Sequence, residues 1–206
     1  MFVRTNGKAD SNFKKRRCII GIDQSYAKVG ISIAVDGKLK KVTSIDMKYI
    51  TTKRAKRLEL KKVLRKALNK CLLKFDANEI AVIHERVRTF TAGAELRPDV
   101  IKAHTQLAVY ICDTAAEFDV ETFSVDTRAW KNAILGSSKP TIEAFPGVKN
   151  PQKIAAVKKV IELGFEESIV KYKHNQSTKT YDDDAADSAC IALYGFVNNP
   201  KLKKEL

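Results

Sequence analysis

Four acidic residues occupy positions from which they could hold metal ions. Asp23 follows the apolar run 18–22, Glu85 follows the apolar stretch 79–84, and Asp184 and Asp187 are three residues apart in a helical pattern. Carboxylates that gather at one place repel one another, so they either take up protons or bind a cation. Their hard oxygen atoms suit Mg²⁺ or Mn²⁺. Two such ions can stabilise the attacking and leaving oxygens of phosphodiester hydrolysis.

The charge of the whole chain indicates what these acids would act on. The sequence has 38 Lys and Arg residues against 24 Asp and Glu, which gives a net charge of +14 over 206 residues. Such an excess indicates a polyanionic partner, nucleic acid ahead of an anionic membrane. A basic protein that holds acidic metal ligands has the charge balance of a nuclease, and a small-molecule substrate is not expected.

Each acid also has a simpler explanation. An acid at the end of a strand is often a turn residue or a helix cap. A helix N-terminus favours negative charge, and this alone could explain the run Asp182, Asp183 and Asp184. Asp183 is also four residues before Asp187 and could replace one of the ligands. The combination of the four positions, rather than any one acid, favours the metal site.

The predicted elements explain how these acids could meet. Asp36-Gly37 indicates a hairpin turn, so the chain should open with three antiparallel strands. Later strands alternate with helices, which predicts an α/β fold with a mixed five-stranded sheet flanked by helices. If the first and fourth strands are neighbours, Asp23 and Glu85 lie side by side at their carboxyl ends, and the last helix supplies the other two acids. The expected strands are 18–22, 29–35, 39–47, 79–84 and 120–125, and the expected helices are 53–75, 99–118, 126–135, 151–163 and 182–196.

One domain is expected, over residues 18–197, between a basic flexible tail at 1–17 and a basic C-terminal tail at 198–206. No apolar run approaches the roughly 20 residues that a membrane span needs, and no signal peptide opens the chain. The four cysteines are scattered without a CxxC pair, which favours reduced, buried thiols. These features predict a cytoplasmic protein that does not enter a membrane.

Basic segments supply candidate contacts to nucleic acid. The helix expected at 53–75 carries many Lys and Arg residues and one acid, Glu59, although a solvated face would look the same. A second basic segment, the loop after Glu85, also carries an aromatic residue. The candidates in these two segments are Lys61, Arg65, Arg86, Arg88 and Phe90. Trp130 is expected in the core or at a dimer contact, and His84 as a packed histidine.

Three segments resemble the RuvC-type Holliday junction resolvases of the RNase H-like superfamily. They are IIGIDQS (19–25) followed by GIS (30–32), AVIHE (81–85) and DAADSACIA (184–192). Weaker likeness runs through WKNAILG (130–136) and QKIA (152–155), so that the resemblance covers residues 18–196. The Arg-rich loop after Glu85, the longer stretch 137–151 and the basic tails depart from the family and resemble its divergent phage-type branch.

The resemblance implies an RNase H-like fold with Asp23, Glu85, Asp184 and Asp187 as catalytic, metal-binding acids. It implies Lys131 and Lys153 as DNA contacts. It also implies a homodimer that nicks two strands of a four-way DNA junction, and for a phage protein the cytoplasm of a bacterial host. Two alternatives stay open: another RNase H-like nuclease acting on RNA–DNA hybrid or structured RNA, and a binder of structured nucleic acid without catalysis. A sugar-kinase or actin-like ATPase needs two such domains and is disfavoured by length.

Overall fold

The computed structural model describes residues 16–87, 90–91, 94–95, 98–139, 143–148, 150–172, 179–197 and 200–205. The predicted basic tail therefore lies outside the described residues up to position 15, as does Arg88. Phe90 is described for its backbone alone. Within the described part, no helix is both long enough and apolar enough to cross a membrane.

A mixed sheet of six strands forms the centre of the fold, in the order β10-β7-β4-β1-β2-β3. The pairs β1–β4 and β4–β7 are parallel, and β1–β2, β2–β3 and β7–β10 are antiparallel. The predicted neighbours, the first and fourth strands, are thus adjacent and parallel. The strands of this sheet are β1 (Cys18–Asp23), β2 (Lys28–Val35), β3 (Lys38–Asp46), β4 (Ile80–Glu85), β7 (Glu121–Val125) and β10 (Leu202–Glu205).

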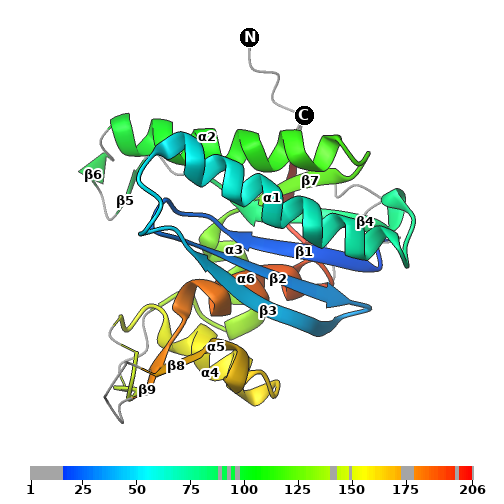
Figure 1. The fold of residues 1–206 in the computed structure, drawn as a ribbon. Coiled ribbons are helices and arrows are strands. Elements are labelled where there is room, and N and C mark those ends of the chain that lie inside the picture. Colours follow the sequence, from blue (N-terminus) through cyan, green and yellow to red (C-terminus); the bar gives the residue numbers. More distant parts are fainter. Residues whose placement is uncertain are drawn as a thin grey trace.

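Helices cover both faces of the sheet (Figure 1). On one face lie α1 (Lys53–Leu72) and α2 (Pro98–Ala116), and on the other lie α3 (Thr127–Leu135), α4 (Ile154–Glu162) and α6 (Asp183–Tyr194). Smaller elements are α5 (Glu166–Ile169), the hairpin β8 (Val170–Tyr172) with β9 (Lys179–Tyr181), the pair β5 (Phe90–Thr91) with β6 (Ala94–Glu95), and a 3₁₀ turn at Ala77–Glu79.

The two hydrophobic cores follow from the alternation of side chains along the strands. In β1, Ile19 packs in the core that contains α6, whereas Ile20 and Ile22 pack in the core that contains α1 and α2. Helix α1 adds Leu60 and Leu64 to that second core, and its spacing of three and four residues keeps the basic side chains outside. Each fully buried side chain of this size contributes about 1.5–3 kcal/mol.

Two glycines allow α6 to lie directly on the β1–β2 hairpin. A Cβ atom at Gly21 would be 2.8 Å from the Cα of Ala192, and one at Gly30 would be 2.6 Å from the carbonyl carbon of Asp184. Real Cβ atoms essentially never come so close to backbone. The backbone of the helix and that of the hairpin are therefore in contact, and any larger residue at these glycines would push the helix away.

The structure corrects three sequence predictions. Residues 202–205 form the sixth strand and do not belong to a tail: β10 pairs with β7, and Ser124 donates a hydrogen bond to Glu205. Helix α4 begins at Ile154 and not at residue 151, because a turn precedes it in which the side chain of Asn150 accepts from the N–H of Gln152. The stretch 164–181, where no helix or strand was expected, contains α5 and the paired strands β8 and β9.

Candidate functional site

The predicted acids meet where β1 and β4 end. Ile22 of β1 pairs with His84 of β4 in parallel register, so Asp23 and Glu85 follow at the same edge of the sheet. Helix α6 brings Asp184 and Asp187 to this edge, because its backbone lies on Gly30. Below, the name acid cluster refers to these four residues, Asp23, Glu85, Asp184 and Asp187.

Lys153 places its ammonium group among three of the four acids. Its Nζ lies 3.5 Å from Asp23 Oδ2 and 3.6 Å from Asp184 Oδ1. It also donates a hydrogen bond to Asp187 Oδ2. Lys153 directly precedes α4, and its side chain is 20% exposed. One lysine charge therefore faces three carboxylates.

Burial dominates the protonation behaviour of the cluster. It raises the pKa of Asp187 to about 6 against the attraction of Lys153, and it raises the pKa of Asp23 well above the ordinary value. The pKa of Asp184 is also raised by burial. For Lys153 burial acts to lower the pKa, but attraction to Asp23 and Asp187 outweighs it and the pKa is raised. Negative charge in this cluster is therefore costly unless a cation accompanies it.

Glu85, which Lys153 does not contact, is held by other groups. The indole Nε1–H of Trp130 donates to Glu85 Oε1 at 3.1 Å. Gln24 Nε2 donates to the Glu85 carbonyl oxygen at 2.6 Å. Trp130 lies on α3 and is fully buried, as expected of a core residue, but sequence reasoning missed its contact with Glu85. The residue type itself indicated such a contact, since a buried indole N–H usually has a hydrogen-bond acceptor.

A cavity of about 270 Å³ opens beside the cluster. It is lined by Asp23, Glu85, Asp184 and Lys153 together with Gln24, Ser25, Arg86, Val87, Val100, Ile101 and His104. Sequence reasoning assigned no role to His104; burial lowers its pKa, which keeps it uncharged near neutrality. His84 does not line the cavity and is buried, as expected of a packed histidine.

A second group of acids lies at the start of α6. Carboxylate oxygens of Asp182, Asp183 and Asp184 lie within 4.8 Å of one another, and no other trio of potential ligands among the described residues is this close. Asp182 serves as the helix cap, since it accepts from the N–H of Ala185 at 3.2 Å. Burial acts to raise the pKa of Asp182, but hydrogen bonds from Lys171 and Ser44 outweigh it and the pKa is lowered. Only Asp184 of these three lines the cavity.

The other predicted contact residues are dispersed. Arg86 is exposed and lines the cavity. Lys131 is buried, with its ammonium on the carbonyl of Gln152 at 3.3 Å and over the ring of Trp130. Lys61 and Arg65 lie on α1, across the sheet from α6, where both form ion pairs with Glu117. The structure thus brings Arg86 and Lys153 to the acids but not Lys61 or Arg65.

The topology is that of an α/β protein, in which helices cover both faces of a mixed sheet. No protein-family model matches the sequence, and no curated protein does. Among solved structures the chain is similar to Thermus thermophilus RuvC in complex with Holliday junction substrate, with a TM-score of 0.60 and 12% identity over 92% of this chain and 100% of that one. A second Thermus thermophilus RuvC structure has a TM-score of 0.56 and 16% identity, and the match covers 91% of this chain and 99% of that one. The yeast mitochondrial Holliday junction resolvase Ydc2 has a TM-score of 0.47 and 17% identity, and the match covers 88% of this chain and 78% of that one.

The two similarities to RuvC, with TM-scores of 0.60 and 0.56, show that the chain has the fold of RuvC, which confirms the predicted RNase H-like fold class. The sheet has six strands in place of the predicted five, because β10 adds a strand beside β7.

Proposed function

We propose that this protein is a metal-dependent endonuclease that resolves four-way DNA junctions, and other branched DNA, by paired nicks made by a homodimer. The observation that carries the proposal is the acid cluster at the ends of β1, β4 and α6, beside a cavity of about 270 Å³. The RuvC fold supports it, since one of the similar structures is a complex with Holliday junction substrate. The net charge of +14 supports a nucleic acid as substrate.

The residues of the cluster fit divalent metal ions. All four side chains offer carboxylate oxygens, the ligands that Mg²⁺ and Mn²⁺ prefer. The Oδ1 atom of Asp187 is buried and has no hydrogen-bond partner, so it has an oxygen to offer. We propose that Asp23, Glu85, Asp184 and Asp187 hold two ions. Bound there, the ions would activate water and neutralise charge on the phosphate.

The chain's own residues would orient ligands and substrate. Trp130 and Gln24 hold Glu85 at its side chain and its carbonyl. Arg86, which is exposed and lines the cavity, would bind a phosphate through its planar group of N–H donors. Val100 and Ile101 give one wall of the cavity an apolar surface, which limits water there. The expected products of in-line attack are a 5′-phosphate and a 3′-hydroxyl.

End-labelled synthetic substrates test this function. A four-way junction, a three-way fork, a plain duplex and an RNA–DNA hybrid are each incubated with the protein and Mg²⁺ or Mn²⁺, and sedimentation gives the oligomeric state. Paired, symmetric nicks in the junction, made by a dimer, would support the proposal. Cleavage of the hybrid alone would indicate a different RNase H-like nuclease. Binding without any cleavage would indicate a protein that only binds structured nucleic acid.

Trp130→Phe is expected to weaken Mn²⁺ binding and junction cleavage about 10- to 100-fold, the usual effect of losing a group that orients a metal ligand. The phenyl ring keeps most of the packing but cannot donate to Glu85. Titration calorimetry with Mn²⁺ and single-turnover cleavage measure the two effects. Ile191→Val, which changes the same core without a hydrogen bond to the cluster, is the control. Equal affinity for Mn²⁺ in wild type and Trp130→Phe would show that Glu85 does not depend on this bond.

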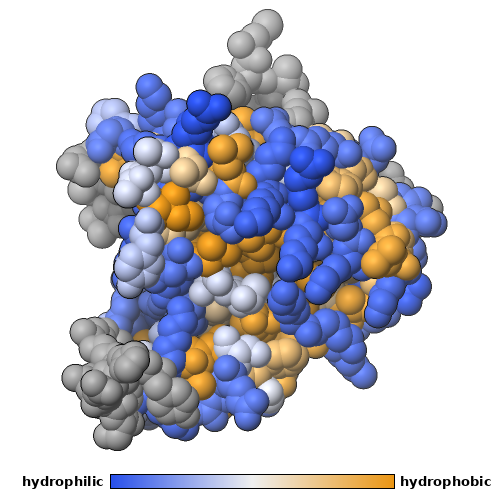
Figure 2. All heavy atoms as spheres, viewed as in Figure 1, coloured by the Kyte–Doolittle hydropathy of each residue, from blue (hydrophilic) through white to orange (hydrophobic). Residues whose placement is uncertain are grey.

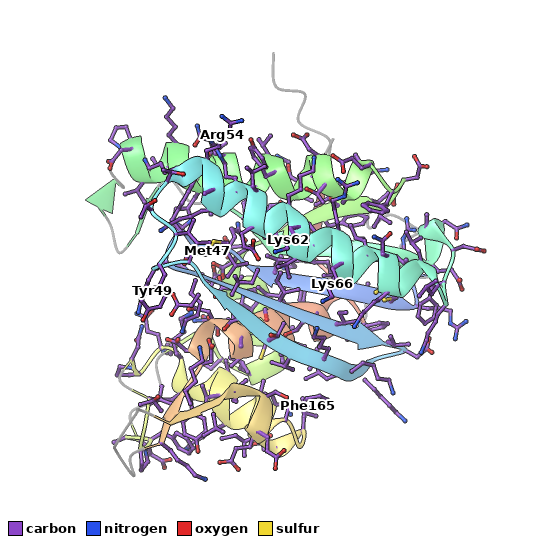
Figure 3. The ribbon with its side chains drawn as sticks, viewed as in Figure 1. Met47, Tyr49, Arg54, Lys62, Lys66 and Phe165 are labelled. Carbon is purple, nitrogen blue, oxygen red and sulfur yellow. The ribbon has the colours of Figure 1, made fainter. Side chains whose placement is uncertain are left out.

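The outer face of α1 is proposed as a further contact for DNA. Figure 2 shows hydrophilic residues over this helix, and Figure 3 labels Lys62 and Lys66 on it. An open groove there is lined by Leu58, Lys61, Lys62, Arg65, Lys66, Asn69, Lys70 and Leu73. Five of the lining residues are basic, and although Glu117 pairs with Lys61 and Arg65 and Glu59 pairs with Lys62, the groove has an excess of positive charge for a phosphate backbone.

The double variant Lys61→Ala, Arg65→Ala is expected to reduce the salt dependence of junction binding. Each lost phosphate contact lowers the slope of log K against log salt by about 0.9. Fluorescence anisotropy over a series of salt concentrations measures the slope. Lys40→Ala, Lys41→Ala removes the same charge from exposed positions of β3 and is the matched control. If the two double variants change the slope equally, the α1 residues contribute only to the net charge of the protein and make no specific contact with DNA.

A further inference from the structure

Lys153 supplies positive charge at the centre of the acid cluster. Its ammonium contacts one oxygen each of Asp23, Asp184 and Asp187. The side chain of Asp187 is only 5% exposed, and that of Asp23 is 14% exposed, so solvent screens the repulsion between their charges only weakly. Lys153 supplies the cation that this arrangement requires.

We propose that Lys153 is the built-in counter-ion of the acid cluster, and that its ammonium and a divalent metal ion occupy the cluster in turn and not together. The inference rests on the proposed metal site. A metal held by these acids would bind oxygens at about 2.0–2.1 Å for Mg²⁺. The oxygens that Lys153 contacts converge on the ammonium, and two cations at one point repel each other strongly.

The surroundings of Lys153 permit the exchange. Its backbone is fixed, because its N–H donates to the Asn150 carbonyl at 2.9 Å and the adjoining Ile154 is buried. Its side chain is a flexible four-carbon stem. The cavity of about 270 Å³ that it lines gives the ammonium a place to move into. Meanwhile Asp187 Oδ1, which has no partner, stays available to the incoming ion.

The exchange would give Lys153 two successive roles. Before metal binds, the ammonium offsets the repulsion among three carboxylates. After metal binds, it is released into the cavity, where a substrate phosphate would lie under the proposed function. Lys131 provides a contrast: it is a neighbouring lysine, but its ammonium lies on the Gln152 carbonyl and the Trp130 ring.

Metal binding by the full-length protein without DNA tests the exchange. Titration calorimetry with Mn²⁺ compares wild type, Lys153→Gln and Lys131→Gln. We expect Lys153→Gln to bind Mn²⁺ at least tenfold more tightly than wild type, and to melt at a lower temperature than wild type in EDTA. Lys131→Gln should show no gain in affinity. Equal or weaker binding by Lys153→Gln, with normal binding by wild type, would overturn the exchange alone.

A measurement on the wild type does not depend on whether that variant folds. Lysine acetylation followed by mass spectrometry reports how accessible each amine is as Mn²⁺ is added. We expect labelling of Lys153 to rise with half-saturation at the same Mn²⁺ concentration as binding, while labelling of Lys131 stays constant. Unchanged labelling of Lys153 while Mn²⁺ binds would overturn the exchange. A wild type that binds no Mn²⁺ would overturn the proposed metal site, and the exchange with it.

Discussion

Asp187→Asn is expected to reduce junction cleavage at least about 10³-fold, which corresponds to roughly 4 kcal/mol of lost transition-state stabilisation. Asp187 is 3% exposed, contacts Lys153 through one oxygen and has a second oxygen without a partner. Asparagine replaces an anionic oxygen by an amide that cannot bind a metal ion as strongly. Single-turnover cleavage of an end-labelled four-way junction in Mg²⁺ measures the loss, and anisotropy should show that binding to the junction persists.

Asp183→Asn is the matched control for this result. Asp183 belongs to the same helix, but Lys153, which forms ion pairs with Asp23, Asp184 and Asp187, does not pair with it. Its replacement should leave cleavage within about threefold of wild type, the small effect usual for a surface change away from the reacting atoms. If Asp183→Asn instead loses as much activity as Asp187→Asn, the trio of Asp182, Asp183 and Asp184 takes part in metal binding.

Gly30→Ala is expected to lower the free energy of unfolding by about 3 kcal/mol, at the upper end of the usual cost of overpacking. The added methyl group would overlap the carbonyl group of Asp184, which is backbone and cannot turn aside. Displacement of α6 would also carry Asp184 away from Asp23, and misplacement by about 1 Å can cost 10²-fold in rate. Urea denaturation followed by circular dichroism measures the stability, and cleavage by the folded fraction measures the second effect.

Gly37→Ala separates contact from backbone conformation. Gly37 lies in the β2–β3 turn with φ of 77°, and a Cβ there would meet nothing within 4 Å. Its replacement should cost only about 1–2 kcal/mol, from the left-handed backbone, and should leave cleavage intact. Wild-type stability of Gly30→Ala would mean that α6 does not rest on β2.

The sequence sufficed to predict five of the six strands of the main sheet and the position of the acids. Apolar runs that end in an acid located Asp23 and Glu85, and the three-residue spacing placed Asp184 and Asp187 on one face of a helix. These inferences succeed because burial imposes a period on the sequence, and because parallel neighbouring strands end at the same edge. The structure places all four acids where β1 and β4 end.

Other features of the site could not be predicted from sequence, for particular physical reasons. Strand β10 has the sequence LKKE, and such a charged segment has no apolar pattern that predicts a strand. It is a strand at the edge of the sheet because it pairs with β7. The bond from Trp130 to Glu85 joins residues 45 positions apart, and Lys153 and Asp23 are 130 apart. No local pattern specifies such contacts, because they depend on how α3 and α4 pack against α6.

The contact between α6 and the β1–β2 hairpin also bears on how the protein folds. Ser32 and Ser188 share a hydrogen bond of 2.7 Å although 156 residues separate them in the chain. Contacts of such high sequence separation form late, because the entropy of closing so long a loop is lost before the contacts stabilise it. Asp184 and Asp187 therefore join Asp23 and Glu85 only when this last closure succeeds. A chain that has not made this closure brings together only two of the four carboxylates, so under the proposed function cleavage would require the completed fold.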